Sequence, residues 1–168
     1  MNEAQDTTPS ERPSWRSVFN FLFRTDQGVI SADVWWRGTL ALVAALVLLS
    51  FVWDAFNRHN SKTALADRAL FDPMIFATYA YLTFYGIMII VICVSHYNLS
   101  AKRLRALNMP PALAGLLPLS ALVAGAAHWL QPRMADVMPM WSVGTLDVLF
   151  GAVALWSIYK LGIAEAGE

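Results

Sequence analysis

The sequence has little charge for its length. Only 14% of its 168 residues are charged, whereas 57% are hydrophobic, and the mean hydropathy is positive at +0.47. Soluble domains average about 25% charged and about 45–50% apolar residues, and here the apolar excess lies in long uncharged blocks. We therefore expect an integral membrane protein rather than a water-soluble globule.

A basic surface and a set of paired cysteines are also lacking. Twelve Lys and Arg residues balance twelve Asp and Glu residues, which argues against nucleic-acid binding. The single cysteine, Cys93, excludes an intramolecular disulfide and a paired-thiol metal site. No hydrolase, phosphate-loop or dinucleotide motif and no zinc-ligand spacing occurs, and the three histidines are expected at different depths, which argues against haem. We expect no enzyme, no cofactor and no metal.

Four apolar blocks are long enough to cross a bilayer, which requires roughly 20 residues of helix. They predict spans at about 34–56, 73–97, 110–130 and 142–163. Each span should be helical, because an unpaired peptide group in hydrocarbon costs several kcal/mol. The sequence therefore predicts an all-α integral membrane protein with four transmembrane helices in an up-down bundle over residues 34–163. Trp35 and Trp36 are expected at the membrane interface where the first span begins.

An amphipathic segment precedes the first span, within a polar segment of residues 1–33. Its apolar face comprises Trp15, Val18, Phe19, Leu22 and Phe23, and its polar face comprises Arg12, Arg16, Asn20 and Arg24. This spacing predicts a helix near 13–24 that lies in the headgroup plane. The alternative is a helix that packs against the cytoplasmic surface of a partner.

The distribution of basic residues predicts the orientation, because Lys and Arg are retained on the cytoplasmic side. One side should receive Arg12, Arg16, Arg24, Arg37, Lys102, Arg103, Arg105 and Lys160. The other should receive Arg58, Lys62, Arg68 and Arg133, together with the acidic Asp54, Asp67, Asp72 and Asp136. We therefore expect both termini, including the tail at 164–168, in the cytoplasm.

Two stretches of the chain resemble a bacterial inner-membrane family catalogued as domain of unknown function 805. Residues 28–36, Gly-Val-Ile-Ser-Ala-Asp-Val-Trp-Trp, resemble the family's Gly-Arg-Ile-Ser-Arg-x-Glu-aromatic-Trp entry to the first span. Residues 101–108, Ala-Lys-Arg-Leu-Arg-Ala-Leu-Asn, resemble its Arg-Arg-Leu-His-Asp-x-Gly loop. Here Arg105, Ala106 and Asn108 replace the His, Asp and Gly. The resemblance implies four spans and a bacterial inner-membrane location, and it implies no activity.

The basic cluster Lys102, Arg103 and Arg105 is expected in the loop between the second and third spans. Basic groups near an anionic leaflet are attracted to lipid phosphates by about 1 kcal/mol each. We expect these residues to contact lipid or a partner, together with Trp15 and Phe19 of the amphipathic segment. A specific lipid pocket and an acidic patch on another protein are the alternatives to a purely topological role.

Asp147 is costly to place, because an acid at the centre of a span costs about 2.5–3.5 kcal/mol on insertion scales. The fourth helix begins either at Met140, with Asp147 about two turns inside, or at Thr145, with Asp147 in the favourable first turn. We expect the second arrangement. A short hairpin would bring His128 near Asp147, either as a hydrogen bond that holds the hairpin together or as a proton relay.

Span two carries Tyr81, Tyr85 and Met88 on one face. These residues either line a pocket for a quinone or lipid tail or bond to neighbouring helices. Small residues in spans three and four favour close helix packing. We expect a non-catalytic accessory or assembly subunit of a larger membrane complex, which contacts lipids and either other membrane-protein subunits or a second copy of itself. The alternative is a small transporter, channel or lipid- or quinone-binding protein.

Overall fold

The computed structural model describes residues 14–61 and 73–164, with the backbone alone for 57–61. All the regular structure in these ranges is helical. Two antiparallel hairpins make up the fold, the first from α2 (Ala32–Ser61) and α3 (Pro73–Ala106), and the second from α4 (Leu116–Leu130) and α5 (Met140–Ser157). The predicted tail beyond residue 164 and the side chains of Arg12, Arg58, Lys62 and Arg68 lie outside the described part.

Short helical segments extend these elements. The amphipathic segment consists of α1 (Trp15–Phe19) followed by the π-helical η1 (Asn20–Arg24). A 3-10 turn, η3 (Pro111–Gly115), leads into α4, another, η4 (Gln131–Arg133), follows it, and the π-helical η5 (Ile158–Ile163) continues α5. Within the part of the chain that the structure describes, four helices are long and apolar enough to cross a membrane, over Ala32–Phe56, Pro73–Ala106, Pro111–Arg133 and Met140–Ile163.

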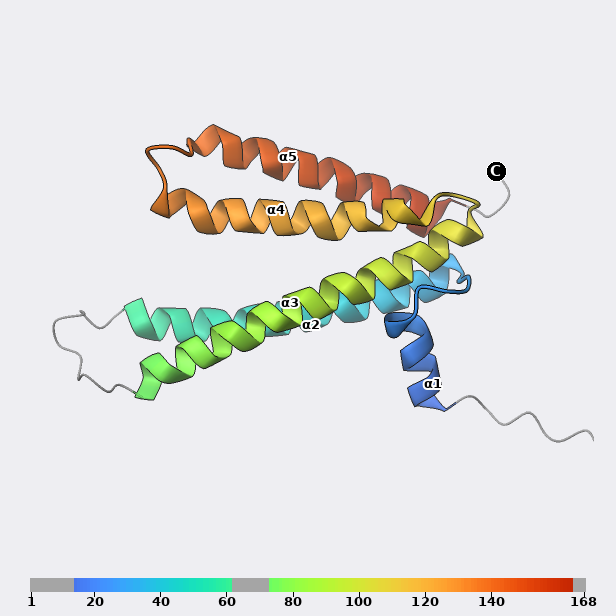
Figure 1. Cartoon of the computed structure of the whole chain (residues 1–168), viewed down its shortest axis with the longest axis horizontal. Helices are drawn as coiled ribbons and strands as arrows, with labels where there is room; N and C mark the ends of the chain where they lie inside the picture. The colour runs from blue at the N-terminus through green and yellow to red at the C-terminus, as the bar shows by residue number, and fades with distance from the viewer. Residues whose placement is uncertain (1–13, 62–72, 165–168) are drawn as a thin grey trace, which may run out of the picture.

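The two hairpins meet at one end of the molecule, which we call the junction. Figure 1 shows them diverging from the junction toward the α4–α5 connection, with α1 projecting crosswise beside α2 and α3. The junction core comprises Ile30, Trp35, Leu99, Ala101, Leu104, Ala114 and Leu161, all buried. Elsewhere the spans present their apolar side chains outward, and the most hydrophobic window of α2 contains no buried residue. Such surfaces suit lipid rather than water.

Helix α3 is longer than the predicted span at 73–97. Its 34 residues correspond to about 51 Å, whereas the hydrocarbon layer is about 30 Å thick. The helix ends in a Schellman motif, in which Met109 N donates to Leu104 O at 2.9 Å and Asn108 N donates to Arg105 O at 3.0 Å. Asn108 has a φ of 55°, and asparagine is the residue that most often replaces glycine in this left-handed position. The basic cluster therefore lies on a helix, and its predicted placement in a loop is wrong.

Glycines allow two close approaches at the junction. A Cβ on Gly38 of α2 would lie 2.7 Å from Leu99 of α3, and a Cβ on Gly162 of η5 would lie 2.8 Å from the indole nitrogen of Trp36. Real Cβ atoms do not approach other atoms so closely. Because glycine has no side chain, α2 can contact both α3 and η5 at these two positions.

Candidate functional site

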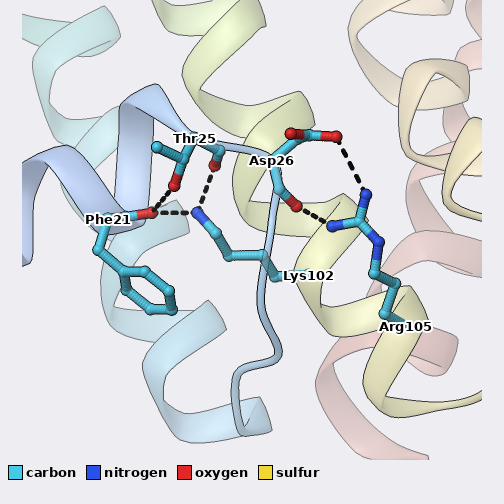
Figure 2. Close-up of polar contacts among 5 residues, drawn as sticks. All are labelled: Phe21, Thr25, Asp26, Lys102 and Arg105. Carbon is cyan, nitrogen blue, oxygen red and sulfur yellow. Dashed lines mark hydrogen bonds and ion pairs between the residues drawn. The ribbon is translucent and has the colours of Figure 1, made fainter.

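Lys102 anchors the interfacial helix, by which we mean α1 together with η1. Its side chain is completely buried, and its Nζ donates to the carbonyl oxygens of Phe21, of Leu22 at 3.1 Å and of Thr25 at 2.5 Å. Figure 2 shows the ammonium between the Phe21 and Thr25 carbonyls. It also lies 4.7 Å from the centre of the Phe21 ring. A cation is favourable here because the last carbonyls of a helix lack intrahelical donors and carry partial negative charge.

Two further contacts hold the same segment against α3. Arg105 donates to the backbone oxygen of Asp26 and, at 3.0 Å, to its Oδ2, as Figure 2 shows. About two turns earlier on α3, Asn98 Nδ2 donates to Phe23 O at 2.8 Å. Polar side chains between residues 98 and 105 of α3 therefore satisfy the end of the interfacial helix and the turn after it.

Arg103 binds backbone carbonyl groups at the end of the second hairpin, as Lys102 does at the end of the interfacial helix. It is 4% exposed, and its Nε donates to Leu161 O at 3.0 Å while its terminal Nη2 donates to Ala164 O at 2.5 Å. Leu161 and Ala164 lie at the end of η5. Adjacent basic residues of α3 thus bind the C-terminal ends of two different helices.

Trp35 and Trp36 both form hydrogen bonds within the junction. Trp35 is 1% exposed and its indole N–H donates to Ser100 Oγ at 3.1 Å. Ser100 Oγ is in turn 3.4 Å from Nδ1 of His96. Trp36 donates to Gly162 O at 3.2 Å. At the start of the first span, Trp35 is thus covered by protein and bonded to α3.

These contacts change the interpretation of the basic cluster. Lipid contact was expected for Lys102 and Arg103, but burial and hydrogen bonds to carbonyl groups leave them no free surface. Arg105 keeps 31% of its side chain exposed beside Asp26. Trp15 and Phe19 are 73% and 46% exposed, so the interfacial helix still offers an apolar surface. All three cations of the cluster thus bind other segments of the chain, and Arg105 also keeps part of its side chain exposed.

The second polar group is a pair in the α4–α5 hairpin. Nε2 of His128 lies 3.0 Å from Oδ1 and 3.1 Å from Oδ2 of Asp147. Helix α5 begins at Met140, so the expected start at Thr145 is wrong and Asp147 lies seven residues inside the helix. Pro139 accounts for the earlier start, because its fixed φ suits the N-cap and its carbonyl accepts the Ser142 N–H at 3.0 Å.

The surroundings of this pair are open. The side chains of His128 and Asp147 are 61% and 46% exposed, and a Cβ added at Gly125 or Gly144 would meet no atom within 4 Å. The hairpin interior instead consists of small residues, with Ala124, Ala127 and Val143 buried. The polar pair thus joins α4 and α5 at the surface of the hairpin, outside its packed interior.

The tyrosine face of α3 packs against α2. Tyr81 donates its hydroxyl to Leu49 O at 2.6 Å, and the hydroxyl groups of Tyr85 and Ser50 are 3.2 Å apart. The Tyr85 ring stacks on Trp53, with 6.3 Å between ring centres. These hydroxyl groups bond to the neighbouring helix, which is the second of the two alternatives considered for this face.

Among the side chains that the structure describes, those of residues 14–56 and 73–164, no three His, Cys, Asp or Glu residues come together in a way that would hold a metal ion. The sequence offered no signal for the partners of the basic cluster, since Asp26, Asn98 and Gly162 carry no recognisable motif. Asn98, a polar residue near the end of an apolar run, was the nearest to a signal.

No protein-family model matches the chain. Neither the curated proteins nor the solved structures yield a match.

Proposed function

We propose that this protein is a non-catalytic accessory or assembly subunit of a larger complex in the bacterial inner membrane. The observation that carries the proposal is the polar and exposed His128–Asp147 pair, which joins two helices of membrane-crossing length. A polar surface within the membrane is more stable when another protein covers it than when it faces lipid.

The depth of Asp147 follows from the length of its helix. The span Met140–Ile163 has 24 residues, which is about 36 Å of helix against about 30 Å of hydrocarbon. Asp147 is about 10 Å from the Met140 end at the same rise per residue. Even if the whole excess length lay outside the bilayer at that end, Asp147 would still be about 4 Å inside the hydrocarbon.

Lipid is an unfavourable neighbour for such a group. Ionisable residues within spans almost always face a protein interior or a water-filled cavity. The pair satisfies part of its own hydrogen bonding, yet about half of each side chain is uncovered. The open glycines at positions 125 and 144 leave room for another helix to approach closely. A transmembrane helix of another subunit would cover the pair and supply the remaining hydrogen bonds.

Photo-crosslinking in intact membranes tests this proposal. A photoreactive phenylalanine analogue replaces Val148, which is 73% exposed beside Asp147, and in a matched control it replaces Ile87 of α3, which is 56% exposed. We expect a discrete adduct at position 148 that is lost when Gly144 is changed to leucine, and no such adduct at position 87. An adduct of twice the 18.6 kDa chain mass identifies a second copy, and another mass identifies a different subunit. Equal labelling at both positions, or none at position 148, refutes the proposal.

The orientation of the chain is part of the same proposal. Arg16, Arg24, Arg37 and Lys160 surround the junction end, whereas Arg133 and Asp136 lie toward the opposite end. The positive-inside rule then puts the junction and both termini in the cytoplasm. Cysteine labelling tests this in the C93A background: a cysteine at Ser14 should react only after the membrane is permeabilised, and a cysteine at Ala135 should react from outside.

Membership of the domain of unknown function 805 family is likewise a proposal. It is supported by the match of Lys102 and Arg103 to the family's paired arginines. It is also supported by the φ of 55° at Asn108, because the family's motif has glycine at the corresponding position and glycine is the preferred residue for such a turn. Sequencing relatives of this chain tests it: they should keep a basic pair at 102 and 103 and glycine or asparagine at 108.

A further inference from the structure

A groove of about 420 Å³ runs between the interfacial helix and α3. Its walls are apolar over most of their length, with Phe19 and Phe23 on one side and Ile90, Val91 and Val94 on the other. The two phenylalanine rings pack against each other with 5.2 Å between their centres. Val94 is 53% and Ile90 is 59% exposed, so the groove is open to whatever surrounds the protein.

The end of the groove nearer the junction is polar. Ser95 and Asn98 of α3 and Arg24 of η1 line this end. Asn98 already donates to Phe23 O, but Arg24 is exposed and forms no ion pair with any described residue. The change from apolar to polar lining follows α3 from residue 90 to residue 98. It matches the change from hydrocarbon to headgroup along the membrane normal.

We propose that this groove binds one anionic phospholipid, with an acyl chain along the apolar walls and the phosphate on Arg24. An isolated guanidinium next to an apolar groove complements a molecule that joins an anion to a hydrocarbon chain. A second groove, between the interfacial helix and the first turns of α2, is less suited to this role. Its basic residue, Arg37, is ion-paired with Asp33 at 2.8 Å.

Native mass spectrometry of the full-length protein tests the site. The protein, purified in mild detergent, is titrated with phosphatidylglycerol and, separately, with phosphatidylcholine. Arg24→Gln removes the cation, and Val94→Trp fills the apolar groove without a change of charge. Arg16→Gln, on the same helix but outside the groove, and Val123→Trp, on α4 at 45% exposure, are the matched controls.

We expect the wild type and both controls to prefer phosphatidylglycerol. Arg24→Gln should weaken phosphatidylglycerol binding about fivefold, as the loss of one basic group near an anionic lipid predicts, and should reduce the preference over phosphatidylcholine. Val94→Trp should weaken the binding of both lipids. The proposal is overturned if Arg24→Gln and Val94→Trp bind like the wild type, if Arg16→Gln loses as much affinity as Arg24→Gln, or if the wild type binds both lipids equally. Because no partner protein takes part, the result is independent of the crosslinking experiment.

Discussion

Replacing Lys102 with methionine tests whether a buried ammonium holds the interfacial helix in place. Methionine keeps a side chain of similar length but removes the charge and every N–H donor. The carbonyl oxygens of Phe21, Leu22 and Thr25 would then lose their partner on α3. The perturbation is local, because Arg103 continues to hold the end of η5.

The size of the effect follows from the number and type of these bonds. A hydrogen bond from a charged donor contributes about 1.5–3 kcal/mol. Three bonds to one ammonium are not additive, and the desolvation of the buried lysine offsets part of their energy. We therefore expect the free energy that holds the interfacial helix against α3 to fall by about 2–3 kcal/mol. The population of molecules in which this helix is detached should then increase about 30- to 150-fold.

Hydrogen exchange measures this population directly. The interfacial helix spans only Trp15–Arg24 and is shorter than the roughly 12–15 residues that an isolated helix needs in water. Its amides should therefore exchange faster by the same factor in Lys102→Met, while α4 and α5 stay protected. Lys160→Met is the control. It also removes an ammonium group, but that group lies 5.5 Å from the centre of the exposed Tyr159 ring and not on the interfacial helix. Unchanged exchange in Lys102→Met, or equal acceleration in both variants, refutes the reasoning.

Two further substitutions test the packing of the junction. Ser100→Ala leaves the buried N–H of Trp35 without its acceptor, so the free energy of unfolding should fall by about 1–3 kcal/mol; an unchanged melting temperature would show that this bond contributes nothing. Gly162→Ala places a Cβ 2.8 Å from Trp36 Nε1 and should cost about 1–3 kcal/mol through overpacking. Gly144→Ala, with open space around it, should melt like the wild type in detergent, and a similar loss in both glycine variants would contradict the packing argument.

The positions of the helices were predictable because they depend on local properties. The interfacial helix, predicted near 13–24, is described over Trp15–Arg24, and the four membrane-length helices coincide with the four apolar blocks. The helix ends were less predictable. Helix α3 continues to Ala106 because Asn108 and Met109 complete its Schellman motif, and hydropathy contains no information about that capping.

The partners of the polar residues were not predictable in the same way. A short connection was enough to suggest that His128 and Asp147 approach each other, and the structure brings them within 3.0 Å. Lys102, in contrast, bonds to residues 77 to 81 positions earlier in the chain. No local pattern reveals which distant carbonyl groups a helix end leaves unpaired.

The membrane character of this protein and its four membrane-length helices were predictable from the amino-acid sequence alone, because both follow from apolar runs long enough to cross the hydrocarbon layer. The contacts of the charged residues, in contrast, depend on how the helices pack against one another. A lysine on a helix end looks the same in the sequence whether it faces a phosphate or a carbonyl group. The burial of Lys102 and Arg103 depends on the approach of two other helix ends, and that approach is a property of the assembled fold.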